Sequence, residues 1–190
     1  AFRNQAHRIS DAVMKGSVIM PFFLLLDRKI RNDWLDFITL YTQAHAVSGL
    51  SYVITASLYD RNRPYVYSNE IPINDKMGTG TRNSFFSGHT STTAVSTFFM
   101  AKVISDYHPE LGNKKFLIFA AALVPPAVVG YYRYKAMKHD PTDVLMGLAV
   151  GAASGILIPH FHKIKRKTGN FSFVPIGGKV NGLYISYSIR

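Results

Sequence analysis

The chain has 190 residues, enough for one domain with a sizeable core, so length alone gives no reason to divide it. Its 22 Lys and Arg residues outnumber its 11 Asp and Glu residues, and the net charge of +11 favours anionic partners such as phosphate groups, acidic lipid surfaces or nucleic acid. The absence of cysteine excludes disulfides, thiolate metal sites and a thiol nucleophile.

Four long runs without Asp, Glu, Lys or Arg predict membrane-spanning helices, and they cover residues 37–59, 84–101, 116–132 and 144–162. Each is close to the roughly 20 residues that cross a bilayer. A fifth run, 16–26, can span only if it extends back past Lys15. A soluble bundle is the alternative, favoured by a mean hydropathy of only +0.05, but the runs lack the charged stripe of a soluble helix. We therefore expect an all-α, membrane-type bundle of about five to six helices.

The hydrophobic periodicity of the sequence changes near the C-terminus. Leu183, Ile185 and Tyr187 alternate with polar or aromatic neighbours, which is the period of a strand, and Gly177 to Gly182 are rich in turn residues. The pattern predicts a short C-terminal β-hairpin. We expect a helical domain over residues 1–168 and a C-terminal extension over residues 169–190.

The loops between the runs indicate an orientation. If each of the four long runs crosses once, ten basic residues lie on one side, in segments 27–36, 102–115 and 163–168. The other side, with segments 60–83 and 133–143, has seven. Basic residues accumulate in cytoplasmic loops, so the side with seven is expected to face outward, toward the periplasm or another extracytoplasmic space.

Three polar clusters lie where runs end or begin on that outward side: "DRNRP" at 60–64, "SGH" at 87–89 and "YYRYKAMKHDPTD" at 131–143. Each has a structural explanation taken alone, since Ser87 and Asp140 suit helix N-caps. Together they supply the groups that phosphoryl transfer needs without a metal. Guanidinium groups bind phosphate oxygens in bidentate fashion, helix-start amides bind the same oxygens, and two imidazoles with a carboxylate can act as nucleophile, acid and orienter.

The spacing of the third cluster resembles a known signature. Arg133, five residues, His139, three residues and Asp143 are similar to the third signature of the type 2 phosphatidic-acid phosphatase superfamily. "SGH" resembles the second signature, and "RP" at 63–64 resembles the end of the first.

The resemblance implies roles for individual residues. His139 would be the nucleophile that forms a phosphohistidine, Asp143 its orienter, and His89 the general acid that later activates water. The phosphate would be held by Arg63, Arg133, Ser87 and the Gly88 amide. No metal and no cofactor are expected, and the implied partners are a phosphorylated lipid substrate and the membrane. Nucleic acid is disfavoured, because the cations flank apolar runs instead of alternating with stacking aromatics.

Two positions depart from the family pattern. The first signature begins with a lysine where this chain has Ala56, so one cation is missing, and Arg61 is the candidate replacement for binding phosphate. The serine before the arginine of the third signature is replaced by Tyr132. Loss of a charged contact to the transition state could cost on the order of 10² to 10³ in rate.

We therefore expect a membrane phosphatase acting on a phosphomonoester or diphosphate, and the membrane-type runs around the clusters favour a lipid as its carrier. Ala56 leaves open a catalytically weakened membrane subunit that binds protein partners, for example through the C-terminal hairpin. The low mean hydropathy leaves open a soluble periplasmic acid phosphatase.

Overall fold

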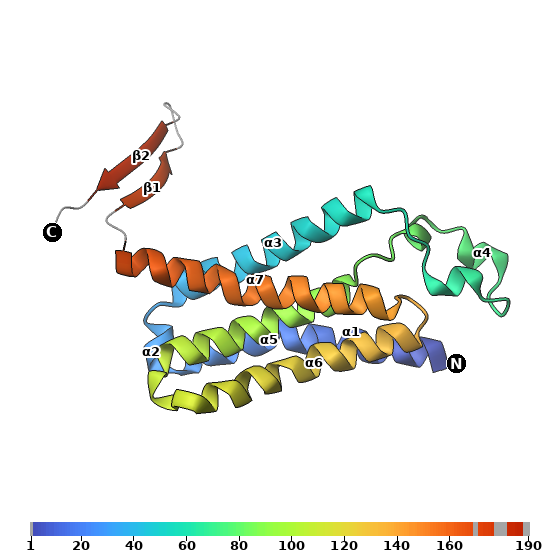
Figure 1. Ribbon diagram of the computed structural model, residues 1–190, viewed down its shortest axis with the longest axis horizontal. Helices are drawn as coiled ribbons and strands as arrows, with labels where there is room; N and C mark the ends of the chain where they lie inside the picture. The colour runs from blue at the N-terminus through green and yellow to red at the C-terminus, as the bar shows by residue number, and fades with distance from the viewer. Residues whose placement is uncertain (1, 169–170, 177–181, 188–190) are drawn as a thin grey trace. The chain divides into compact units, whose positions relative to one another are not determined.

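The protein is mainly helical. The computed structural model describes residues 2–168, 171–176 and 182–187. Within these ranges the five long helices are α1 (Phe2–Ile19), α3 (Trp34–Leu58), α5 (Gly88–Tyr107), α6 (Lys115–Lys135) and α7 (Pro141–Thr168) (Figure 1). The short helical segments are η1 (Met20–Leu26), α2 (Arg28–Arg31), η2 (Pro64–Tyr67), α4 (Ile73–Lys76), η3 (Thr79–Arg82) and η4 (Pro109–Lys114). The predicted all-α body is confirmed.

The chain forms two compact units, Ala1–Pro159 and His160–Arg190. In the second unit, β1 (Phe171–Ile176) and β2 (Gly182–Tyr187) pair antiparallel, with Phe171 opposite Tyr187. Residues 177–181, which would form the turn, lie outside the described residues. The complete hairpin and the domain boundary after residue 168 therefore stay predictions.

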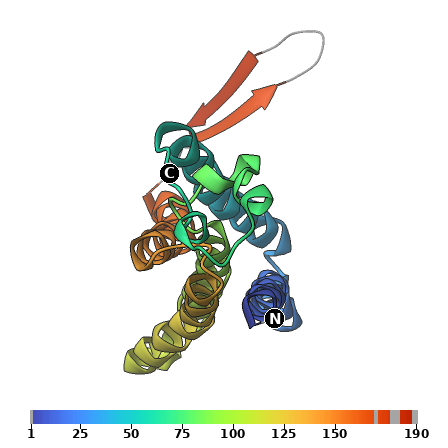
Figure 2. The same cartoon turned by 90° about the vertical axis from the view of Figure 1, so that its right-hand side faces the viewer.

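Helix α5 lies at the centre of the first unit and contacts α1, α3 and α6. In Figure 2 the end that carries the N-terminus and α4 faces the viewer, and the long helices are seen from that end. The buried face of α5 is rich in hydroxyl groups, many of which bond back to the carbonyl one turn earlier, as in the Thr93 to His89 bond of 2.8 Å. Small hydroxyl side chains of this kind let helices approach closely and still satisfy their own polar atoms.

Three glycines spaced four residues apart bring α7 against α5. A Cβ atom added at Gly147 would lie 2.5 Å from the Ser87 carbonyl oxygen, and one at Gly151 would lie 2.3 Å from the Ser91 oxygen. One at Gly155 would lie 2.7 Å from the Val95 oxygen. Because no side chain fits in these gaps, the glycines fix the distance between the two backbones.

The apolar core lies toward the opposite end of the bundle from the three polar clusters. Phe37 and Tyr41 of α3 pack there against Phe99 of α5. The Tyr41 hydroxyl donates to the Val18 carbonyl at 2.8 Å and also contacts Ser96 of α5 at 2.9 Å. This end is therefore held by ring packing and one shared hydroxyl that joins three segments.

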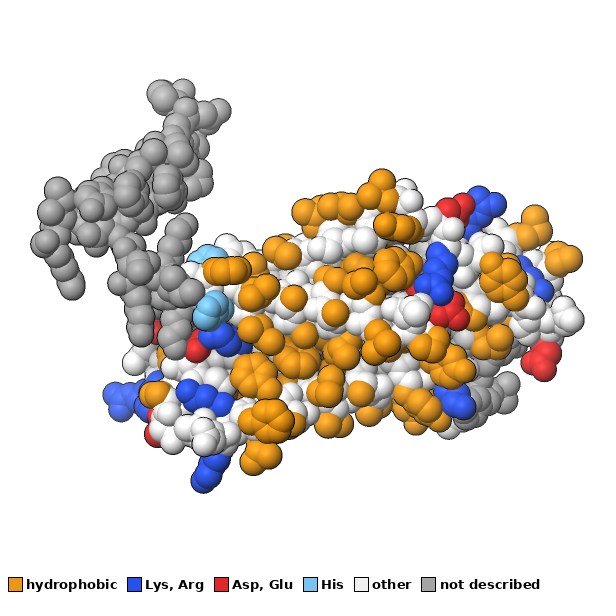
Figure 3. All heavy atoms as spheres, viewed as in Figure 1, with side chains coloured by type: hydrophobic (Ala, Val, Ile, Leu, Met, Phe, Trp, Pro, Cys, Tyr) orange, Lys and Arg blue, Asp and Glu red, His pale blue; other side chains and the backbone are white. Residues whose placement is uncertain are grey.

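The outer surface of the first unit is apolar. Large hydrophobic side chains such as Leu58, Phe116 and Leu117 are mostly exposed, and Figure 3 shows apolar side chains over the middle of the bundle with charged ones near its ends. An apolar exterior around a hydroxyl-rich interior is the arrangement expected in lipid.

Three helical stretches in the described part of the chain are long and apolar enough to cross a membrane: Asn4–Leu26, Pro109–Lys135 and Pro141–His162. The N-terminal stretch meets the condition that the sequence set for it, because α1 and η1 extend the 16–26 run back past Lys15, whose side chain is exposed. Runs 37–59 and 84–101 do form helices, but they fall outside this set because Ser, Thr, Tyr and His lower their apolar content.

Candidate active site

The three polar clusters meet at one end of the first unit, where α3 ends and α5 and α7 begin. Backbone hydrogen bonds tie the loop after α3 to the loop before α5: the Arg61 amide donates to the Arg82 oxygen at 3.0 Å, and the Arg63 amide donates to the Thr81 oxygen at 2.8 Å. The Tyr65 amide donates to the Met137 oxygen at 3.0 Å and so adds the loop before α7. These bonds place Arg61 and Arg63 beside the third cluster, about 70 or more residues further along the chain.

His139 is buried, and its tautomer follows from its partner. Its Nδ1 atom lies 2.7 Å from the carbonyl oxygen of Ser84. A carbonyl can only accept, so Nδ1 carries the proton and donates it. In the neutral ring the lone pair is therefore on Nε2, the atom available for attack. Burial lowers the pKa of His139, and the positive charges of Arg133 and Arg63 lower it further, while Asp143 opposes them. The neutral form of His139, with its lone pair on Nε2, is favoured.

Asp143 is fully buried, and its carboxylate accepts hydrogen bonds from Ser84, from the Asp140 amide and from Arg61. Its Oδ2 atom accepts from the Ser84 hydroxyl at 2.5 Å and from the Asp140 amide at 3.0 Å. The second of these bonds is the acid half of a capping box at the start of α7. His139 Nδ1 is 3.7 Å from the same oxygen. The carboxylate thus acts on His139 mainly as a nearby negative charge, and the Ser84 carbonyl provides the direct hydrogen bond.

The guanidinium group of Arg61 contacts the carboxylates of Asp140 and Asp143 at the start of α7. Its Nη1 atom donates to Asp143 Oδ1 at 2.6 Å and to the Thr142 hydroxyl at 2.9 Å, and its Nη2 atom donates to Asp140 Oδ2 at 3.0 Å. These contacts indicate that Arg61 fixes the start of α7. The sequence predicted that Arg61 binds the phosphate in place of the lysine that is missing at Ala56. That role stays a prediction, and these contacts do not favour it.

Arg63 and Arg133 contrast with Arg61. Among the described residues, the Nε atoms of both are buried and lack a hydrogen-bond acceptor. Arg133 is almost completely buried, and its Nη1 atom donates to His7 Nδ1 at 3.1 Å. An unsatisfied buried donor is costly, more so when it is charged. Two such donors beside His139 form a place where an oxyanion would satisfy both.

The start of α5 supplies further donors. Ser87 precedes the helix and is buried, and its hydroxyl contacts the Thr90 hydroxyl at 2.9 Å. Its amide donates to the Asp143 carbonyl at 2.9 Å, which links the starts of α5 and α7. The amides of the first helical turn, including that of Gly88, have no acceptor within the helix and lie at the positive end of its dipole. This is a favourable position for an anion.

His89, in the first turn of α5, faces both the site and α1. Burial is the main cause that lowers its pKa to about 4, and the positive charge of Arg133 adds to the effect. Asp11 of α1 opposes it, with Oδ1 only 2.9 Å from His89 Nε2. A positive charge on His139 also lowers the pKa of His89.

Three residues of this site were not predicted from the sequence: His7, Asp11 and Ser84. Ser84 acts through its backbone carbonyl as well as its hydroxyl, and a backbone acceptor leaves no mark in a sequence. His7 and Asp11 are one helical turn apart, a spacing that could have marked them as a pair on one face of α1. In the described part of the chain, no three His, Asp or Glu side chains form a cluster that could hold a metal ion.

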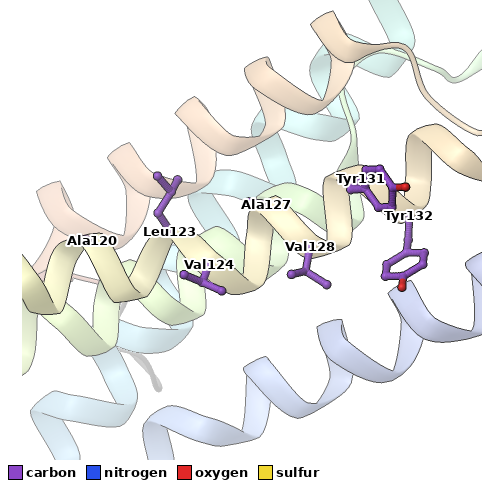
Figure 4. A pocket seen from close by; sticks show the side chains of 7 residues that line it. All are labelled: Ala120, Leu123, Val124, Ala127, Val128, Tyr131 and Tyr132. Carbon is purple, nitrogen blue, oxygen red and sulfur yellow. The ribbon is translucent and has the colours of Figure 1, made fainter.

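An apolar groove of about 560 Å³ runs along α6 from Ala120 to Tyr132 and ends one residue before Arg133. Figure 4 shows Leu123, Val124 and Val128 along it, with Tyr131 and Tyr132 at the end near the active site. The groove is shallow and open and contains none of the ionisable catalytic candidates.

Comparisons with known proteins agree with this geometry. The sequence profile of the PAP2 superfamily matches residues 37–167, which is more than half of the chain. The fold is similar to the crystal structure of the first transmembrane PAP2 type phosphatidylglycerolphosphate phosphatase from Bacillus subtilis, with a TM-score of 0.59, 19% identity, and coverage of 86% of this chain and 84% of that one.

It is also similar to Aquifex aeolicus LpxE, with a TM-score of 0.51, 21% identity, and coverage of 84% of this chain and 90% of that one. None of the curated proteins matches the sequence. With the profile match covering all three polar clusters, the expected relationship is confirmed: this chain belongs to the PAP2 superfamily.

Proposed function

We propose that the protein is a metal-independent phosphatase that hydrolyses a phosphomonoester or diphosphate of a lipid through a phosphohistidine intermediate. The observation that carries the proposal is the pair of buried, unpartnered Nε donors on Arg63 and Arg133, next to the nucleophilic tautomer of His139. A phosphate group would accept from both guanidinium groups and from the first-turn amides of α5.

In the first step the Nε2 lone pair of His139 attacks phosphorus, and the bond from phosphorus to the leaving oxygen breaks. The negative charge of the bound phosphate favours the protonated form of His89, which gives its proton to that oxygen, so the product leaves as a neutral alcohol, or as a phosphorylated product when the substrate is a diphosphate. The phosphorylated imidazole keeps its Nδ1 hydrogen bond to the Ser84 carbonyl. The buried charge of Asp143 stabilises the positive ring, as a triad carboxylate does.

In the second step a water molecule attacks phosphorus from the position that the product vacated. His89, now neutral, takes a proton from the water, the bond between phosphorus and nitrogen breaks, and inorganic phosphate leaves. Ser87 and the Gly88 amide hold the non-bridging oxygens in both steps. Each imidazole thus returns to its starting protonation state at the end of the cycle.

A lipid substrate is supported by the surface of the bundle. Three membrane-length helices contribute residues to the site, and the groove on α6 leads along an apolar surface to Tyr132, next to Arg133. The relative from Bacillus subtilis is itself a phosphatidylglycerolphosphate phosphatase. If α3 and α5 cross the membrane together with the three apolar helices, the distribution of basic residues over the loops supports a site that faces outward.

A second candidate is a catalytically weakened membrane protein with a structural or partner-binding role. One observation favours it: Ala56 replaces the expected lysine, and Arg61, the candidate replacement, already donates to Asp140 and Asp143. Measured turnover distinguishes the two candidates.

The test is phosphate release by the detergent-purified protein from mixed micelles of phosphatidic acid, phosphatidylglycerol phosphate or an isoprenoid diphosphate. We expect release from at least one lipid, and we expect His139→Gln to lower kcat by about three orders of magnitude or more. The matched control is His160→Gln, an exposed histidine outside the site. Full turnover by His139→Gln would exclude the assigned nucleophile, and no release by the natural protein would favour the weakened subunit.

A further inference from the structure

Helix α1 places two ionisable side chains in the active site, although it lies outside the residues that match the superfamily profile. Asp11 Oδ1 is 2.9 Å from Nε2 of His89, and His7 Nδ1 is 3.1 Å from Nη1 of Arg133. Both contacts are made to residues assigned to the phosphatase mechanism. The first helix is therefore part of the site as well as a candidate membrane span.

The hydrogen-bond roles in this cluster can be worked out. A guanidinium has no acceptor, so Arg133 donates and His7 Nδ1 carries a lone pair. His7 Nδ1 then cannot donate to Asp11 Oδ1, although the two atoms are 3.3 Å apart. Arg133 Nη1 is 4.0 Å from the same oxygen, too far for a hydrogen bond. The partner of that Asp11 oxygen is thus the Nε2–H of His89.

We propose that Asp11 is a positioning residue for the general acid, holding His89 by Nε2–H so that its other nitrogen delivers the proton to the leaving oxygen. This inference rests on the proposed phosphatase function. Asp11 of α1 would orient an imidazole as the carboxylate of a catalytic triad does. In this site the oriented imidazole is the general acid, His89, and not the nucleophile.

The surroundings of His89 show why a carboxylate is needed there. The groups that face it are His7 and Asp11 on α1, Arg133 on α6 and His139 before α7. Burial and the charges of Arg133 and His139 disfavour the imidazolium, and Asp11 is the one negative charge among these groups. Removing that charge lowers the pKa of His89 further, so the acid loses its proton at a lower pH.

The experiment compares Asp11→Asn with the natural protein on two substrates, an alkyl phosphate and p-nitrophenyl phosphate. The alkoxide needs a proton in order to leave, whereas nitrophenolate leaves without one. We expect kcat/KM to fall about 10- to 100-fold for the alkyl phosphate and by less than about threefold for the aryl phosphate. The alkaline limb of the alkyl profile should move to lower pH. Glu70→Gln, an exposed carboxyl-to-amide change far along the chain, is the matched control.

The ratio of the two losses is measured within one preparation, so partial misfolding of Asp11→Asn cancels. Equal losses on both substrates, or no loss on either, would overturn the role of Asp11 while leaving the phosphatase function intact. Absence of turnover by the natural protein on both substrates would overturn the function and this role together.

Discussion

A methyl group at Gly147 is expected to separate the two halves of the active site. The Cβ of Gly147→Ala would lie 2.5 Å from the Ser87 oxygen, about 0.9 Å short of an ordinary contact at 3.4 Å. The added Cβ is fixed to the backbone of α7 and the atoms that it meets are backbone atoms of Ser87, so α7 must move away from α5. Asp143, one turn before Gly147, accepts from the Ser87 amide through its carbonyl at 2.9 Å, and that bond must stretch as well.

The displacement acts between the start of α5, the proposed phosphate-binding segment, and His139, which precedes α7. A misplacement of about 1 Å between reacting groups can cost about 10²-fold in rate. Overpacking of this kind also costs about 1 to 3 kcal/mol of stability. We therefore expect Gly147→Ala to lower kcat/KM about 100-fold and to lower the midpoint of thermal unfolding in detergent.

The control is Gly49→Ala on α3, where an added Cβ meets no atom within 4 Å. Replacing glycine by alanine inside a helix stabilises it by about 0.5 to 1 kcal/mol, so this variant should keep full activity. Both variants are assayed by phosphate release and by thermal unfolding in the same detergent. If Gly147→Ala were as active as Gly49→Ala, the contact between α7 and α5 would not set the geometry of the site.

Two further outcomes follow from the site and from the opposite end of the bundle. Ala56→Lys should raise kcat/KM on a phosphomonoester, because it restores a cation while Arg61 stays bound to the α7 acids; no gain in steady-state assays would mean that Arg63 and Arg133 suffice. Hydrogen bonds to Glu110 and Asp27 raise the pKa of His108 above its value in the unfolded chain, so the stabilisation they give is complete below about pH 6.5 and is lost as the pH rises through the folded-state pKa. His108→Gln should remove that part of the pH dependence of thermal unfolding, and parallel curves for the two proteins would contradict it.

The sequence predicted the features that depend on local patterns, namely charge-free runs and fixed spacings between polar residues. Charge-free runs predicted the positions of α3, α5, α6 and α7, and the spacing from Arg133 to Asp143 placed a helix end, a loop and the next helix start. These features are local, since they depend on helical period and on capping residues such as Asp140. Local patterns therefore located the helices and gathered the candidate residues at one end.

What the sequence could not supply were contacts decided by tertiary packing. Arg61 was expected on the phosphate, yet the pairing of its loop with residues 82–84 carries it to Asp143. The backbone acceptor of His139 is Ser84, and no side-chain pattern identifies a carbonyl. Asp11 lies 78 residues from His89 along the chain, on a helix that begins well before the charge-free run 16–26. Each of these contacts depends on how the helices pack.

The central claim is that His139 Nε2 carries the phosphoryl group. The most direct measurement is to mix the His89→Gln variant with p-nitrophenyl phosphate, quench within milliseconds, and locate covalent phosphate by peptide mass spectrometry. That variant should accumulate the intermediate, because nitrophenolate leaves without a proton from His89, whereas hydrolysis of the intermediate needs His89 to activate water. The account predicts acid-labile phosphate on His139 and none in a His139→Gln, His89→Gln double variant. Phosphate on another residue, or turnover without any phosphoenzyme, would contradict it.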